Sequence, residues 1–186
     1  MYSPKINTVS VLNGLALINA ERITGYNKVL QLLPDDTTAY HKYARLRSPL
    51  ADIVRETMKF CRTLENIVLI EGGKNDQNIK VNQELLELAK DIGTAFTGLS
   101  KDGFLPACEL CEHLSQKAYS LALDQSLQPE LYQIVGAQKL ELQKSQASIR
   151  SLQNRLTPAV NDNNKDVNDD LHKLTNPGKP ILLAAG

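Results

Sequence analysis

Two carboxylates and a histidine lie close together in the chain and are the first candidates for chemistry. Glu109 and His113 are four residues apart, so a helix places them on one face, and Glu112 directly precedes the histidine. Ferritin-like helical bundles hold two metal ions with carboxylates from two helices and a Glu-x-x-His motif from each of two others. This chain offers only the single cluster of Glu109, Glu112 and His113 in place of two such motifs, so no cofactor is expected. A divalent metal held by these three residues, with Glu21, is the alternative reading.

Two cysteines form a second candidate. Cys108 and Cys111 make a C-x-x-C motif about one turn inside a predicted helix, and a helix N-terminus can stabilise a reactive thiolate. Both sulfurs fall on the apolar face of that helix, and no second C-x-x-C completes a zinc site. We therefore expect small core residues, with a thiol redox module as the alternative.

Polar side chains on the apolar faces of predicted helices are the most unusual feature. Asn19, Arg22 and Arg47 stand where a charge or an amide needs a partner. We expect a buried polar network that fixes helix register and no catalytic residue. The alternative is that the arginines reach out to the bundle ends. The expected network consists of Asn19, Arg22, Tyr26, Arg47, Glu112 and Gln138, with Tyr119 and Ser145 as further partners.

The elements that must position these residues are helices. Apolar residues recur at three- and four-residue steps through most of the chain. Pro49 predicts a kink or break near Arg45 to Ser48. The pattern predicts an all-α, ferritin-like four-helix bundle whose third helical stretch is interrupted at Ser100 to Gly103. The expected helical ranges are 8–33, 37–70, 85–99 continued by 104–123, and 129–156.

The last part of the chain has a different character. Residues 161–170 are almost wholly Asn, Asp and Lys, which cannot bury enough apolar surface to offset the ordering entropy. We expect a helical bundle domain over residues 1–157 and a polar, mobile C-terminal tail over residues 158–186.

Composition excludes some partners and compartments. The 186 residues carry no formal net charge, which argues against nucleic-acid binding through a basic surface. No apolar run approaches the roughly 20 residues of a membrane span. The N-terminus has no signal-peptide pattern, and three cysteines do not make a disulfide framework. A cytoplasmic protein with a protein partner, or a homo-oligomer, is expected.

Several short strings together resemble a known family. They are Leu12-Asn13, the string from Ile18 to Tyr26 (INAERITGY), Cys108 to Glu112, Lys117-Ala118-Tyr119, and Pro129-Glu130-Leu131 leading to Gln138. Their order and spacing resemble the bacterial family labelled domain of unknown function 2383. The resemblance covers about residues 7–156 and implies a ferritin-like four-helix bundle without an established activity.

This chain departs from the family at two positions. Gln146 stands where many members carry a histidine, and His113 stands where members carry a further acidic residue. Metal binding through those positions is therefore in doubt for this chain.

The expected function follows from these observations. We expect an uncharacterised, non-enzymatic helical bundle with a structural or protein-interaction role, linked to stress. The alternative is a ferritin-like metal-binding protein or oxidoreductase that uses Glu21, Glu109, Glu112 and His113.

Overall fold

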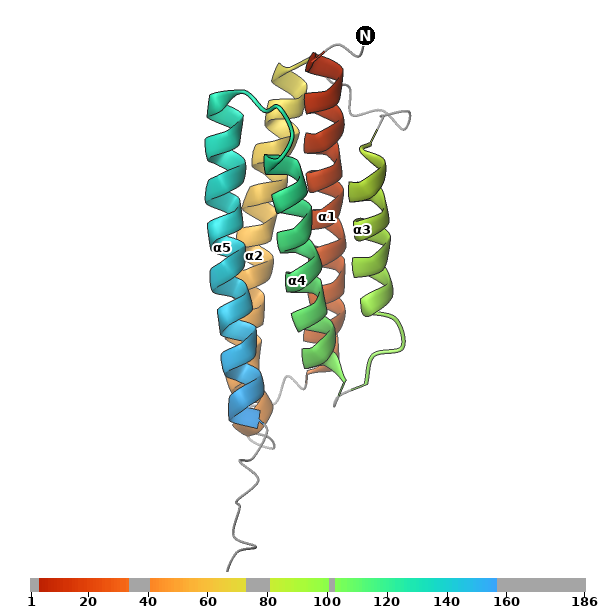
Figure 1. The fold of residues 1–186 in the computed structure, drawn as a ribbon. Coiled ribbons are helices and arrows are strands. Elements are labelled where there is room, and N and C mark those ends of the chain that lie inside the picture. The colour runs from red at the N-terminus through yellow and green to blue at the C-terminus, as the bar shows by residue number, and fades with distance from the viewer. Residues whose placement is uncertain (1–3, 34–40, 73–80, 101–102, 157–186) are drawn as a thin grey trace, which may run out of the picture. The chain divides into compact units, whose positions relative to one another are not determined.

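A computed structural model describes residues 4–33, 41–72, 81–100 and 103–156, and the chain separates into two units, residues 1–156 and 157–186. The described residues form five helices and no strand (Figure 1), which confirms the predicted all-α class. The tail predicted to be mobile lies outside the described residues. The helices are α1 (Pro4–Leu32), α2 (His41–Ile70), α3 (Gln83–Ala95), α4 (Phe104–Leu123) and α5 (Pro129–Leu156).

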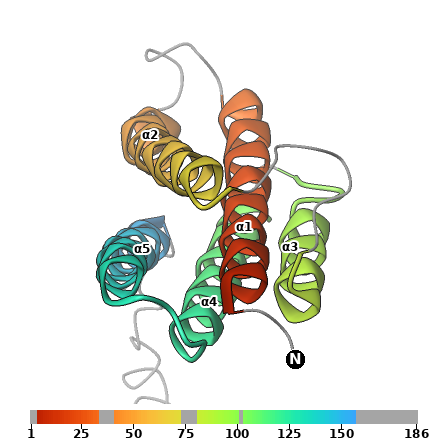
Figure 2. The ribbon, with the colours of Figure 1, turned by 90° about the horizontal axis from the view of Figure 1, so that it is seen from above.

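Four of these helices enclose the interior of the first unit. Helix α1 packs against α2 and α4, while α5 packs against α4 and, less extensively, against α2. Helix α3 lies outside this ring, against α1 and α4 (Figure 2). Consecutive helices run in opposite directions along the unit (Figure 1). The polar residues singled out above come from the four helices of the ring.

The predicted interruption at Ser100 to Gly103 is confirmed, but the prediction that the parts on either side form one helix of the bundle is wrong. Helices α3 and α4 lie side by side and run in opposite directions (Figure 1). Helix α3 ends at Ala95, and Gly98 then adopts a positive φ of 63° that a side chain would disfavour. The chain therefore reverses before α4. Because the apolar spacing on both sides is helical, the sequence pattern did not distinguish an interruption from a reversal.

Of the kink or break predicted near Pro49, the break is wrong, because α2 continues through this residue, and the kink stays a prediction. Proline in a helix interior costs about 3 kcal/mol. On either side of it, Leu46 and Leu50 are buried in the core. Their packing holds the helix together across the missing backbone donor.

Two glycines of α1 allow α3 to approach closely. A Cβ atom on Gly14 would lie 2.6 Å from Leu85 Cδ1, and one on Gly25 would lie 2.1 Å from Phe96 Cδ2. Both apolar partners are buried. Residue Asn82, whose side chain accepts hydrogen bonds from the backbone N–H groups of Glu84 (3.0 Å) and Leu85 (3.2 Å), caps the start of α3. Helix α3 is thus held by apolar packing into notches in α1.

This packing predicts the effect of a single methyl group. The substitution Gly25→Ala should lower the free energy of unfolding by about 1–3 kcal/mol, because the Phe96 ring must move to admit the new Cβ. Urea denaturation measures this loss. The matched control is Gly136→Ala in α5, where a Cβ meets nothing within 4 Å. It should stabilise the protein by roughly 0.5–1 kcal/mol. Equal effects of the two substitutions would contradict the notch.

Candidate functional site

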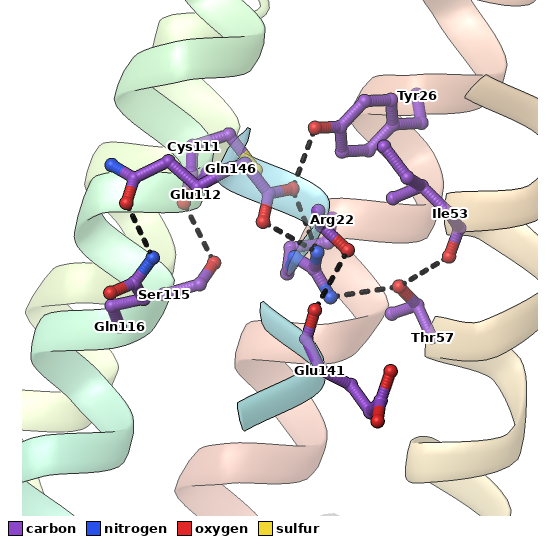
Figure 3. Close-up of polar contacts among 11 residues, drawn as sticks. Arg22, Tyr26, Ile53, Thr57, Cys111, Glu112, Ser115, Gln116, Glu141 and Gln146 are labelled. Atoms are coloured by element: carbon purple, nitrogen blue, oxygen red, sulfur yellow. Dashed lines mark hydrogen bonds and ion pairs between the residues drawn. The ribbon is translucent and has the colours of Figure 1, made fainter. Parts of the chain in front are cut away.

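A buried ion pair lies at the centre of the helical ring (Figure 3). Arg22 follows Ile18 by one helical turn on the buried face of α1, and only 1% of its surface is exposed. Its Nη2 atom donates to both carboxylate oxygens of Glu112 on α4, at 2.7 Å to Oε1 and 3.0 Å to Oε2. Arg22 is therefore buried and paired with a carboxylate, as its place on the apolar face predicts.

The carboxylate of Glu112 has a second partner. Its side chain is fully buried, and Oε1 also accepts a hydrogen bond from the Tyr26 hydroxyl at 2.6 Å. Tyr26 comes one turn after Arg22 on α1, so both donors approach from the same helix. Both oxygens of Glu112 are thus engaged by groups of the protein.

Helix α2 joins the ion pair through a threonine. The Nη1 atom of Arg22 donates to Thr57 Oγ1 at 2.8 Å, and this hydroxyl donates to the Ile53 carbonyl at 2.7 Å. Thr57 is 1% exposed and was not predicted. The available signal was the apolar stripe of this helix, which steps seven residues from Val54 to Cys61, with Thr57 at the position between them that would be apolar.

A second buried chain of hydrogen bonds runs beside the ion pair. Asn19 Nδ2 donates to the Tyr119 hydroxyl at 2.8 Å, and that hydroxyl donates to Gln138 Oε1 at 2.8 Å. These residues come from α1, α4 and α5, and each is buried. The two groups together, which we call the interior polar cluster, join α1, α2, α4 and α5. It consists of Asn19, Arg22, Tyr26, Thr57, Glu112, Tyr119 and Gln138.

Arg47, by contrast, lies at the end of α1 and not in the cluster. Its Nη1 atom donates to the carbonyls of Leu30 (3.0 Å) and Leu33 (3.2 Å). A cation at a helix C-terminus satisfies carbonyls that have no partner within the helix and stabilises the helix dipole. The predicted place of Arg47 in the network is therefore wrong, and the alternative role at a bundle end is correct.

Two further polar residues of α5 make other bonds, Ser145 within its own helix and Gln146 to α4. The Ser145 hydroxyl donates to the carbonyl of Glu141, one turn earlier in its own helix, at 3.2 Å. Gln146, at the position where the resembling family carries a histidine, accepts a hydrogen bond from Gln116 Nε2 at 2.7 Å. This amide pair links α4 to α5 without a charge.

The charge on Arg22 is maintained by its surroundings. Burial alone would lower the pKa of the guanidinium, but attraction to neighbouring groups, led by the Glu112 carboxylate, outweighs burial and raises this pKa. Burial raises the pKa of the Tyr26 hydroxyl well above its ordinary value, and the negative charge of Glu112 adds to the effect. The tyrosine therefore stays a neutral hydrogen-bond donor.

Both cysteines of the C-x-x-C motif are poor nucleophiles in this environment. Cys108 and Cys111 are free thiols that are fully buried on α4. Burial raises the pKa of Cys108 well above its ordinary value, and burial together with the Glu112 charge raises the pKa of Cys111 to about 12. Since the thiolate is the reactive form, their placement supports core packing.

The candidate metal ligands do not converge. Glu109 is bound to Arg150 on the molecular surface (3.2 Å), and His113 is exposed. Glu112 is occupied by Arg22 and Tyr26, while Glu21 faces Gly93 of α3. Within the part of the chain that the structure describes, no group of three His, Cys, Asp or Glu side chains could hold a metal ion. A ferritin-type di-metal centre does not fit these residues.

The ion pair predicts a strong effect of removing one partner. Glu112→Gln should lower the free energy of unfolding by about 3–5 kcal/mol, because it leaves the Arg22 charge buried without a counter-charge. The double variant Arg22→Met/Glu112→Leu should lose much less free energy of unfolding than the sum of the losses in Arg22→Met and Glu112→Leu. Urea denaturation of the singles and the double measures this coupling. The control Glu109→Gln, which breaks an exposed pair, should cost under about 1 kcal/mol; a similar loss from both glutamate variants would refute the role of the pair.

The buried thiols predict instability in alkali. The folded state raises the pKa of Cys111 from 9.0 to about 12, so the unfolded chain releases this proton first. The contribution of the protonated Cys111 thiol to the free energy of unfolding is complete below pH 9. It is lost as the pH rises from 9.0 to about 12, with a slope of about 1.4 kcal/mol per pH unit for each such group. Unfolding by urea at a series of pH values tests this. The variant Cys108→Ala/Cys111→Ala keeps Cys61 and the buried tyrosines, whose pKa values are also raised, so its stability should decline less steeply with pH than that of the wild type; identical profiles would contradict the assignment.

The described helices also bear on membrane insertion and family membership. In the described part of the chain, no helix combines the length and apolar character that a bilayer span requires. No family model, curated protein or solved structure matches the chain. The geometry of the interior polar cluster is therefore the basis on which function is proposed.

Proposed function

We propose that this protein acts by presenting helix surfaces to other protein molecules and not by catalysis. The observation that carries this proposal is the closed interior polar cluster. A catalytic acid, base or nucleophile must reach its substrate, but Arg22, Tyr26 and Glu112 are at most 1% exposed. Their polar groups bind one another across the helix ring. This arrangement favours a structural role for the cluster.

The cluster supports such a role by fixing the helices relative to one another. A slip of α1 against α4 would separate Arg22 from Glu112 and leave two buried charges unpaired, which is strongly unfavourable. Large apolar side chains remain exposed on the outer faces of α2, α4 and α5, where they are available for protein contacts. These exposed side chains are Met58, Leu69, Ile70, Leu110, Tyr132 and Leu140.

We also propose that α1, α2, α4 and α5 form a ferritin-like four-helix bundle to which α3 is added. The interior polar cluster joins these four helices, whereas α3 packs through apolar side chains into glycine notches. Residues that carry the family resemblance, including Asn19, Arg22, Tyr26 and Gln138, belong to the cluster. Because no family model matches, membership of the family stays a proposal.

The cytoplasm is the compartment we propose. The three cysteines are free thiols, and reduced thiols are typical of that compartment.

Metal and thiol analysis of the same preparation tests the proposed function. Protein purified without chelators should contain no stoichiometric iron, manganese or zinc. Alkylation of the folded protein should modify the half-buried Cys61 faster than Cys108 and Cys111, which should react only after unfolding because burial keeps them protonated. A stoichiometric metal that is lost in the variant Glu109→Gln/His113→Ala would overturn the proposal. So would a Cys108–Cys111 disulfide in the folded protein.

A further inference from the structure

Two polar atoms beside the buried ion pair have no partner in the protein. Arg22 Nε and Asn19 Oδ1 are buried, and neither is hydrogen-bonded to any group that the structure describes. The other nitrogens of Arg22 bind Glu112 and Thr57. The amide nitrogen of Asn19 binds the Tyr119 hydroxyl. The bonding capacity left over is therefore one N–H donor and one carbonyl acceptor.

This donor and this acceptor come from neighbouring positions on α1. Asn19 and Arg22 are three residues apart, which makes their side chains neighbours on one face of the helix. Long side chains in a helix point back toward its N-terminus and cover the preceding turn. The stem of Arg22, which carries Nε, thus extends over the turn that holds Asn19. One small molecule that both accepts and donates hydrogen bonds can join two groups at this spacing.

Helix α4 places a small side chain opposite these two residues. Glu112, Ser115 and Tyr119 follow one another at three- and four-residue steps on one buried face of α4. Arg22 binds the first of them and Asn19 binds the last. Ser115 therefore lies opposite the interval between the two α1 residues, and Figure 3 shows it on the side of α4 toward Arg22. Because serine is the smallest of the three, the room between α1 and α4 is greatest at this level.

Ser115 also offers a third hydrogen-bonding group. Its hydroxyl donates to the Cys111 carbonyl at 2.7 Å, and a hydroxyl oxygen that donates one bond keeps lone pairs that can accept others. Buried water molecules typically make about three hydrogen bonds to polar groups of the protein. One donor and two acceptors match a water molecule, whose oxygen accepts one bond and whose two protons are donated.

We propose that one water molecule is bound between α1 and α4, where it accepts a hydrogen bond from Arg22 Nε and donates to Asn19 Oδ1 and Ser115 Oγ. The ligand must be neutral, because the charge of Arg22 is already balanced by Glu112. It must also be small, because each of these four side chains is at most 1% exposed and offers no opening to a larger molecule. Water meets both conditions.

This water joins the two parts of the interior polar cluster. Among the described residues, the ion pair and the chain of bonds that begins at Asn19 share no direct hydrogen bond. A bridging water makes them one network that runs from Thr57 on α2 to Gln138 on α5. Water-mediated hydrogen bonds are nearly as favourable in enthalpy as direct ones, and bonds in a chain strengthen one another. The inference goes beyond the proposed function, because it holds whatever the outer faces of the helices bind.

Transfer of magnetisation from water to the isotope-labelled full chain tests the proposal by NMR. The Nε–H proton of Arg22 should show a cross-peak with water that has the sign of a dipolar contact and not that of proton exchange. A high-resolution crystal structure should also show one water peak about 3 Å from Arg22 Nε, Asn19 Oδ1 and Ser115 Oγ. The competing partner is the Cys111 thiol, which lies beside the guanidinium but accepts hydrogen bonds weakly. If the sulfur takes the bond, no water contact appears and the proposal fails.

Two variants separate a bound water from a relayed signal. A hydroxyl proton that exchanges with bulk water can imitate the contact, and Thr57 brings such a hydroxyl to the same guanidinium. Asn19→Leu removes the acceptor but leaves that hydroxyl in place, so the cross-peak should disappear. Asn13→Leu is the matched control on α1, because Asn13 Nδ2 is also buried without a partner among the described residues; it should keep the cross-peak. A cross-peak that persists in Asn19→Leu, or that is lost in both variants, would overturn the inference.

Discussion

The first unit depends on one requirement, that the positive charge of Arg22 be neutralised away from water. A guanidinium at 1% exposure cannot remain without a counter-charge, and Glu112 supplies it from a residue 90 positions later in the chain. Thr57 takes up a second nitrogen from the opposite side. These bonds together fix the separation and the register of α1, α2 and α4.

Not every atom in this region is satisfied by another group of the protein. Asn19 Oδ1 and Arg22 Nε are buried without a partner among the described residues. Such an atom costs roughly 1–3 kcal/mol if it is unsatisfied, and a water molecule held on it costs up to about 2 kcal/mol in entropy. The cluster is therefore more costly than an apolar core of the same shape. That cost is consistent with a gain in specificity of helix arrangement, since hydrophobic contacts alone tolerate sliding.

Much of this interior could be predicted from the sequence, and the reasons for the failures are physical. Arg22 stands in an unbroken apolar stripe, so its burial and its need for a carboxylate follow from helical periodicity. Arg47 also follows that periodicity, but it is near the end of a ring helix, where nearby carbonyls offer an alternative partner. Thr57 has a short side chain with no charge, so only a gap in the apolar stripe marked it. The reversal between α3 and α4 depends on the conformation of Gly98, which spacing does not encode.

The seating of α3 has a consequence for the electrostatics of the interior. Phe96, which fills the notch at Gly25, also packs against the Tyr26 ring with centroids 5.9 Å apart. Tyr26 in turn is bonded to Glu112. The same aromatic contact thus anchors α3 and keeps bulk solvent from the ion pair. The local dielectric around Arg22 and Glu112 is therefore set partly by a helix that makes no polar bond to either of them among the described residues.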